Sequence, residues 1–335
     1  MRLNKIIAIF TYVILGLQVT HGNNGELQRY ELGGVTQGTT YQIVYYADKP
    51  QIRQNQIDAL LERIDKSMSL YRDDSKITRF NDSSVQKLRL DTDMVKVIEE
   101  AFKVYHNSDG LFDITVKPLV SLWGFSAEEF TEAPSQKIID EVLPRIGMDK
   151  LKLDGDTLYK LKQGIEIDLD GIAQGYSVDV VAQYIMSEGI ENFVVEIGGE
   201  LFAKGIKPDG KPMQIALYRP VVQQGEAEYY TLGIDGWAVT SSGISEQYRH
   251  IGDKVISHHI DPKTGHPLEN SNLGVTVIAS TAMQADAWDN VFMAMSVEDA
   301  LETAEKMKGL ELYIAYKENG EVKEQFTSGF KKYFN

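Results

Sequence analysis

The sequence predicts an α+β protein in which a mainly antiparallel sheet packs with helices. Short segments of alternating polarity, separated by Gly, Pro and Asp turns, predominate over residues 193–279. Segments with helical spacing lie before and after them without a regular strand-helix-strand alternation, which argues against a parallel sheet. With 335 residues, 43% hydrophobic and 25% charged, the chain can bury a substantial core and lacks the composition of a disordered protein.

The order of the elements follows from hydrophobic periodicity. Apolar residues at a spacing of three and four predict helices over residues 57–71, 95–105, 135–146, 178–185, 283–295 and 297–307. Alternating or short apolar runs predict strands over residues 41–46, 165–169, 193–197, 213–218, 229–234, 255–258, 275–279 and 312–316. Ser135 is the expected N-cap of its helix, and Gly171 the expected turn after residues 165–169.

The N-terminus has the pattern of a secretory signal. Arg2 and Lys5 precede an apolar run over residues 6–17, which is too short to span a bilayer and is followed by small and polar residues. We expect a signal peptide over residues 1–22 and a single domain over residues 30–335, in an exported, periplasmic protein. An uncleaved anchor that holds the protein at the inner membrane is the alternative.

Charge and cysteine content exclude several classes of function. The chain has 34 Lys and Arg against 49 Asp and Glu, a net charge of −15, and no basic stripe, so we expect no nucleic-acid partner. It contains no Cys, which excludes disulfides, thiolate catalysis and a lipoprotein anchor. The glycine-rich patterns of Rossmann and P-loop nucleotide sites are also missing.

The first candidate site lies in the expected helix over residues 283–295. Asp286, Asp289 and Asn290 stand at i, i+3 and i+4, so their side chains share one helix face. Hard oxygen donors in this array suit Mg²⁺ together with substrate phosphates. The alternative is that acidic residues near a helix N-terminus merely complement the helix dipole, and spacing alone favours that alternative.

A second acidic cluster surrounds a glycine turn. Glu166, Asp168 and Asp170 precede Gly171, and a helix is expected to follow. Backbone amides at such a turn can hold an anion, and a carbonyl there can ligate a metal. A polar strand face followed by an ordinary tight turn explains the same pattern.

Three of the six histidines fall within residues 258–267. His258, His259 and His266 therefore suggest a metal site or proton transfer. His258 and His259 are adjacent, however, and in a strand they would point to opposite faces, which weakens a joint zinc site. We expect one of these two to be structural.

Several separate motifs in one order carry a family resemblance. They are residues 38–41, 68–75, 79–81, 110–115, 118–120, 122–125, 168–176, 197–200, 241–243, 258–267 and 285–290. In these segments, from about residue 37 to about residue 297, the chain resembles the FAD:protein FMN transferase (ApbE) family. The resemblance implies the ApbE-like, T-fold-related flavin-transferase architecture.

The resemblance also implies an activity and a site. The activity is Mg²⁺-dependent transfer of FMN from FAD onto a Ser or Thr hydroxyl of another protein, with a phosphoester bond formed and AMP released. The implied Mg²⁺ ligands are the side chains of Asp286, Asp289 and Asn290 and the carbonyl of Gly171, so Asp286 is essential to catalysis. His258 is the implied base for the attacking hydroxyl. The implied flavin contacts are Gln37, Tyr71, Leu111, Phe112, Asp113, Asp168, Gln174 and Ile260.

Three positions depart from the family pattern. Asn290 replaces the usual Thr, Gln174 replaces a Lys found in many members, and Gln37 replaces the usual Met. The chain lacks a segment resembling the family's acceptor motif, so the expected partner is a separate acceptor protein, an exported or membrane-bound redox subunit. Two other functions use the same residues: an Mg²⁺-dependent FAD pyrophosphatase that yields FMN and AMP, and an FAD-binding or storage protein.

Overall fold

A computed structural model describes residues 27–125, 133–223, 226–244, 248–251 and 254–335. The expected signal peptide over residues 1–22 lies outside these ranges. Within them, no helix combines the length and the apolar character needed to cross a membrane.

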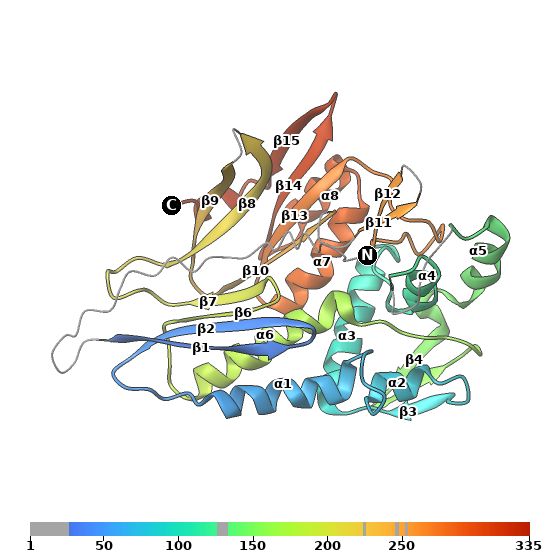
Figure 1. Cartoon of the computed structure of the whole chain (residues 1–335), viewed down its shortest axis with the longest axis horizontal. Helices are drawn as coiled ribbons and strands as arrows, with labels where there is room; N and C mark the ends of the chain where they lie inside the picture. Colours follow the sequence, from blue (N-terminus) through green and yellow to red (C-terminus); the bar gives the residue numbers. More distant parts are fainter. Residues whose placement is uncertain (1–26, 126–132, 224–225, 245–247, 252–253) are drawn as a thin grey trace, which may run out of the picture.

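An eight-stranded sheet forms the centre of the molecule (Figure 1). Every neighbouring pair in it is antiparallel, which confirms the predicted fold class. Its strands, in spatial order, are β1 (Gln28–Thr36), β2 (Thr39–Ala47), β6 (Phe193–Ile197), β7 (Glu200–Lys204), β10 (Trp237–Gly243), β13 (Asn272–Ala279), β14 (Leu310–Glu318) and β15 (Glu321–Phe326).

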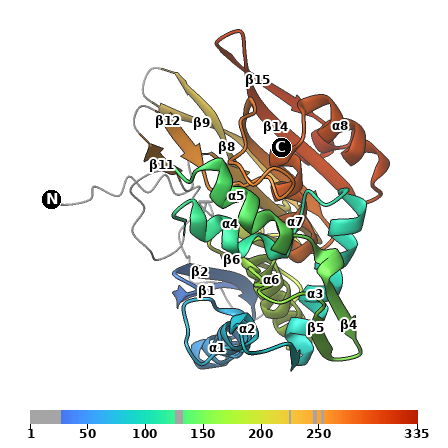
Figure 2. The same cartoon turned by 90° about the vertical axis from the view of Figure 1, so that its right-hand side faces the viewer.

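Helices α1 (Gln54–Met68), α6 (Asp170–Ser187), α7 (Ala282–Ala294) and α8 (Val297–Lys306) pack on one face of this sheet. The described residues also form α2 (Lys76–Asn81), α3 (Thr92–Asn107), α4 (Lys117–Leu122) and α5 (Gln136–Val142). Helix α6 packs on β6 and β7, α7 packs on β10 and β13, and the two helices contact each other (Figures 1 and 2). Residues of both helices line the cavity that contains the candidate site.

Smaller β elements complete the structure. The hairpin of β8 (Met213–Gln223) and β9 (Glu226–Ile234) shares a buried cluster with the sheet face that the helices leave open. A second small sheet is formed by β3 (Lys87–Arg89), β5 (Thr157–Lys160) and β4 (Leu151–Asp154). The hairpin of β11 (Tyr248–Ile251) and β12 (Lys254–Ser257) leads directly into the histidine segment.

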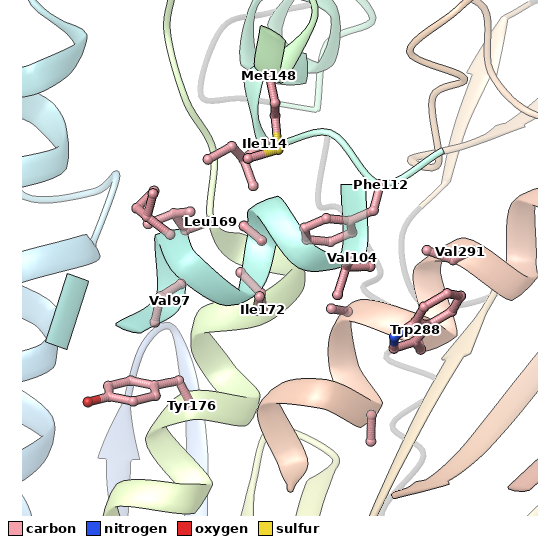
Figure 3. Packing of buried hydrophobic residues seen from close by; sticks show 14 of the residues in the cluster. Val97, Val104, Phe112, Ile114, Met148, Leu169, Ile172, Tyr176, Trp288 and Val291 are labelled. Atoms are coloured by element: carbon pink, nitrogen blue, oxygen red, sulfur yellow. The ribbon is translucent and has the colours of Figure 1, made fainter. Parts of the chain in front are cut away.

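The largest hydrophobic cluster fills the space between α3, α6 and α7 (Figure 3). Val104 of α3, Ile172 of α6 and Trp288 of α7 contribute to it, together with Phe112 from the loop after α3. Because these side chains are at most 7% exposed, the elements that carry the predicted site residues share one packed core.

The predicted strand over residues 165–169 is wrong. Ile165, Ile167 and Leu169 are buried as the alternation indicates, but the segment joins no sheet. The side chain of Asn81 replaces the partner strand: its Oδ1 accepts from the Ile167 amide and its Nδ2 donates to the Ile167 carbonyl, both at 2.8 Å. The backbone is thus satisfied without a ladder.

Three helix boundaries also differ from the prediction. Helix α6 begins at Asp170, well before the predicted segment over residues 178–185, so Gly171 lies inside the helix rather than in a turn before it. Helix α5 ends at Val142 and a 3₁₀ turn over Leu143–Arg145 follows, because Pro144 has no amide hydrogen for an α-helical bond. Helix α1 ends at Met68, so Tyr71 stands in the loop after it rather than on the helix.

Candidate active site

A cavity of about 630 Å³ lies beside the N-terminal half of α6 and the middle of α7. Every site residue that the family resemblance implies lines it: Gln37, Tyr71, Leu111, Phe112, Asp113, Asp168, Gly171, Gln174, His258, Ile260, Asp286, Asp289 and Asn290. Segments more than 200 residues apart in the sequence therefore meet at one place. This placement agrees with a common site, while the individual roles remain predictions.

Helices α6 and α7 approach each other closely at Gly175. A Cβ atom at this position would lie 2.3 Å from the carbonyl oxygen of Ala282, so only glycine fits. The Gly175 amide donates a 2.8 Å hydrogen bond to Oδ2 of Asp286. The glycine therefore fixes a carboxylate of α7 against the backbone of α6.

The same hydrogen bond affects Gly171. In a regular helix the amide of Gly175 would donate to the carbonyl of Gly171, four residues earlier. Here that amide has the Asp286 carboxylate as an acceptor, and Gly171 has non-helical angles of φ −87° and ψ 20°. A kink at Gly171, close to the residues of α7 that line the cavity, suits a carbonyl that ligates a metal.

Asn290 is held by its own helix. Its Nδ2 donates to the carbonyl of Asp286 at 2.9 Å and to Oδ1 of Asp289 at 3.1 Å. Both bonds use the amide nitrogen, so the amide oxygen is the atom suited to a cation. The residue thus keeps an oxygen donor for a metal although it replaces the family's usual Thr.

Burial raises the pKa of several carboxylates around the cavity. It raises the pKa of Asp286 to about 7, and it also raises the pKa of Asp168. The pKa of Asp170 lies well above its usual value, first because of the Asp168 carboxylate and then because of burial and Asp286. The charge of Lys117 offsets only part of this effect at Asp168, so a group of crowded carboxylates remains that fits a divalent cation.

Across the described residues, no three Asp, Glu or His side chains are grouped so that they could hold an ion by themselves. The predicted set contains only two carboxylates, with an amide oxygen and a backbone carbonyl beside them. A cation here would therefore also need oxygens from the substrate, which is the usual arrangement for Mg²⁺ with phosphates.

The two adjacent histidines line the same cavity, so the prediction of opposite faces is wrong. Both follow the last residue of β12 and lie outside the strand; their rings are 4.0 Å apart. Nδ1 of His259 is 2.8 Å from the Ser257 hydroxyl and Nε2 is 3.2 Å from that of Ser242. Burial, and then the charge of His258, lowers the pKa of His259 well below its usual value, so it is neutral and structural.

His258 and His266 have different surroundings. The His258 ring lies edge-on to Phe125, with 6.3 Å between ring centres. His266 is hydrogen-bonded to the side chain of Gln136 at 3.0 Å and is not among the residues that line the cavity. A joint metal site of the three histidines therefore finds no support among the described residues.

The expected flavin contacts surround the cavity on several loops. Gln37 occupies the tight turn between β1 and β2 with φ 50° and donates to the Ser177 hydroxyl at 2.7 Å. Tyr71 is 76% exposed, so its ring is accessible for stacking at the cavity wall. Gln174 donates to the carbonyl of Ile197 at 3.3 Å.

Among these expected flavin contacts, Asp113 is buried and its carboxylate accepts two hydrogen bonds. Its Oδ1 accepts from the amide of Thr115 at 2.8 Å and from its hydroxyl at 2.6 Å. Burial raises its pKa to about 6 despite these bonds. Leu111 and Phe112 precede it in the loop, and Ile260 forms an isolated β-bridge with Pro267.

Sequence reasoning missed Lys117. Among the described residues that line the cavity it is the one Lys or Arg, and its Nζ lies 2.8 Å from Oε2 of Glu166. A single lysine at the start of the short helix α4 belongs to no periodic pattern, so no signal in the sequence distinguishes it. Ser241 and Ser242, by contrast, stand in a motif that carries the resemblance.

Comparisons with known proteins show the family and the fold of the chain. The model of the ApbE family matches residues 37–314. The FAD:protein FMN transferase of Vibrio cholerae is 35% identical, with 99% of both chains covered, and that of Haemophilus influenzae is 34% identical, with 92% of both covered. The solved flavin transferase ApbE from Vibrio cholerae has a TM-score of 0.84 at 35% identity and covers 92% of this chain and 99% of its own. The apo flavinyl transferase ApbE from Pseudomonas stutzeri has a TM-score of 0.84 at 29% identity, with 93% and 99% covered.

Proposed function

Since the chain belongs to the ApbE family and transfers FMN from FAD to an acceptor protein, we propose that it does so with Mg²⁺ and a Ser or Thr hydroxyl of the acceptor. The product is a phosphoester between FMN and the acceptor, and AMP leaves. The observation that carries this proposal is the convergence of buried Asp286 with Asp289, Asn290 and the kinked Gly171 in the cavity that also holds His258.

The side chains of Asp286, Asp289 and Asn290 and the carbonyl of Gly171 would hold the cation. Bound Mg²⁺ would offset the charge of the two phosphates of FAD and the charge that develops on the leaving AMP. The chain itself brings little positive charge to the cavity, because Lys117 is paired with Glu166. This scarcity explains why an acidic protein would depend on a metal for a dianionic substrate.

His258 is the proposed base. Its imidazole takes the proton of the acceptor hydroxyl while that oxygen forms a bond to the phosphorus on the flavin side. The bond between this phosphorus and the oxygen of the AMP phosphate breaks, and the electron pair leaves with AMP. The edge contact with Phe125 and the neutral His259 ring beside it orient the imidazole.

The remaining wall of the cavity would position FAD. The proposed contacts are Gln37, Tyr71, Leu111, Phe112, Asp113, Asp168, Gln174 and Ile260. Tyr71 provides an exposed aromatic face suited to an offset stack on a flavin or adenine ring. Positioning of this kind, together with electrostatics, accounts for most of the catalysis in phosphoryl transfers.

We also propose that the reaction takes place outside the cytoplasm, on an exported or membrane-bound acceptor. The N-terminal pattern of Arg2, Lys5 and the apolar run supports export to the periplasm, with attachment to the inner membrane where the segment stays uncleaved. The acceptor would then be an exported or membrane-bound redox subunit that presents a Ser or Thr in its flavinylation motif.

The test is to incubate the protein with FAD, Mg²⁺ and a Ser- or Thr-containing acceptor peptide and to measure the peptide mass. We expect a gain of one FMN per peptide and an equal amount of AMP. FMN and AMP released equally without peptide would support the pyrophosphatase, and unchanged bound FAD would support storage. Asp286→Ala should abolish transfer in a folded protein, whereas Glu302→Ala, at a carboxylate 63% exposed on α8, should not.

A further inference from the structure

Two carboxylates link α6 and α7 in opposite directions. Asp179 of α6 accepts from two amides of α7, those of Ala282 at 2.8 Å and Met283 at 3.0 Å, with one oxygen for each. Asp286 of α7 accepts in return from the amide of Gly175 on α6 at 2.8 Å. Each helix therefore binds the backbone of the other through a buried side chain.

The bonds of Asp179 hold the N-terminus of α7. The first amides of a helix have no acceptor within it. In α7 the side chain of the N-cap residue Thr281 accepts from the amide of Gln284, at 3.2 Å, and Asp179 satisfies the two amides before it. Asp179 is 7% exposed, so water does not readily replace it. The start of α7 is thus held by α6 as much as by its own cap.

The relative position of the two helices matters because the proposed metal ligands are divided between them. Gly171 lies on α6, and Asp286, Asp289 and Asn290 lie on α7. The helices lie side by side in both views (Figures 1 and 2). A small slide or rotation of α7 would therefore move three ligands away from the fourth, and metal sites tolerate little such displacement.

We infer that Asp179 is a positioning residue of the metal site, which fixes the N-terminus of α7 against α6 and thereby sets the affinity for the cation. This inference rests on the proposed Mg²⁺ site. Asp179 does not line the cavity, so it acts on the ligands through the helix and has no direct part in the proton transfer at His258.

The variant Asp179→Asn tests this role. Asn has the size of Asp but offers one acceptor oxygen and turns an N–H donor toward the second amide. Binding of Mn²⁺, as a spectroscopic probe for Mg²⁺, is measured on the full chain by electron paramagnetic resonance in the absence of FAD. We expect the dissociation constant to rise by about 10-fold or more, which is typical for loss of a residue that supports metal ligands. The Mg²⁺ concentration for half-maximal transfer should rise in parallel, while kcat at saturating Mg²⁺ changes by less than about threefold.

Asp91→Asn is the matched control. Asp91 caps α3 by accepting from the amide of Met94 at 2.9 Å, the same type of bond at a helix that carries no proposed metal ligand. It should leave the Mn²⁺ affinity unchanged. Asp179→Ser, which keeps one acceptor, provides the same measurement if the Asn variant does not fold.

Two results would overturn the inference: an unchanged Mn²⁺ affinity in folded Asp179 variants, or a fall in kcat with unchanged affinity. Absence of Mn²⁺ binding in the unsubstituted protein is a different failure, because it would remove the proposed metal site itself. The affinity is measured well below the unfolding temperature, so that a purely stabilising role of Asp179 would leave it unchanged.

Discussion

Divalent-cation affinity should fall steeply as the pH is lowered through neutrality. A metal binds the ionised form of a carboxylate, so a proton on the ligand competes with it. Burial raises the pKa of Asp286 to about 7, so this ligand is half protonated near physiological pH. An ordinary surface carboxylate would compete with the metal only below about pH 5.

The expected change in the dissociation constant for Mg²⁺ follows from the pKa of Asp286. Asp286 is about 90% ionised at pH 8 and about 3% ionised at pH 5.5, so the dissociation constant should rise about 30-fold between these values. Isothermal titration calorimetry with Mg²⁺ at both pH values measures this change. Repeating it at pH 6.5 in two buffers of different ionisation enthalpy counts the released protons, and we expect about 0.8 per cation bound, the protonated fraction of Asp286 at that pH. Equal affinities at pH 5.5 and 8, or no proton release, would refute the argument.

In the metal-free protein, the raised pKa of Asp286 makes the stability depend on pH. The pKa of Asp286 is 3.8 in the reference state and about 7 in the folded chain, so between these values the folded state binds more protons than the unfolded state. Stability should therefore fall as the pH rises from about 4 to 7, by about 4 kcal/mol from this group. Mg²⁺ should restore stability most above pH 7. Thermal unfolding measures both effects, and Asp286→Asn should show a shallower pH dependence.

Three further substitutions test other contacts. Gly175→Ala places a Cβ against the Ala282 carbonyl and should lower stability by about 1–3 kcal/mol in urea unfolding; an unchanged midpoint would contradict the close approach. Lys117→Gln removes the one Lys or Arg side chain among the described residues that line the cavity and breaks its ion pair with Glu166. The cavity becomes more negative, so the KM for FAD should rise by about fivefold, mainly at low salt, and a salt-independent rise would argue against an electrostatic cause. Asn81→Ala leaves the amide and carbonyl of Ile167 without their side-chain partner and should lower the free energy of unfolding by about 2–3 kcal/mol. A melting temperature equal to that of the unsubstituted protein would refute this account.

Much of the fold was predictable because local periodicity reflects burial. The strand expected over residues 193–197 matches β6 at both ends, α3 extends the predicted helix by a few residues at each end, and α7 is shifted by one residue from its prediction. The strands β1 and β15 were missed because both lie at the edges of the sheet, where one backbone edge is unpaired and few side chains are fully buried. Strand β10 was missed because Thr, Ser and Gly make up most of its second half, although it lies in the sheet centre.

The parts of the site that could not be predicted depend on contacts between distant segments. Residues 165–169 have the alternation of a strand, but the partner of Ile167 is Asn81, 86 residues earlier, and no local pattern specifies a side chain in place of a strand. The two histidines share the cavity because β12 ends before them, a boundary that the composition of residues 255–258 does not mark. The proposed metal ligands come from the family resemblance, since spacing alone favours the helix dipole.

The structure decides against the dipole interpretation of the acidic residues in α7. Charge effects of a helix N-terminus act within its first turn. Helix α7 begins at Ala282 and has no acidic residue in its first turn, so Asp286 and Asp289 lie beyond the range of that effect. The carboxylate that complements the N-terminus is Asp179, which comes from α6. Asp286 is 4% exposed and burial raises its pKa, and its position in the cavity agrees with a cation shared with the substrate.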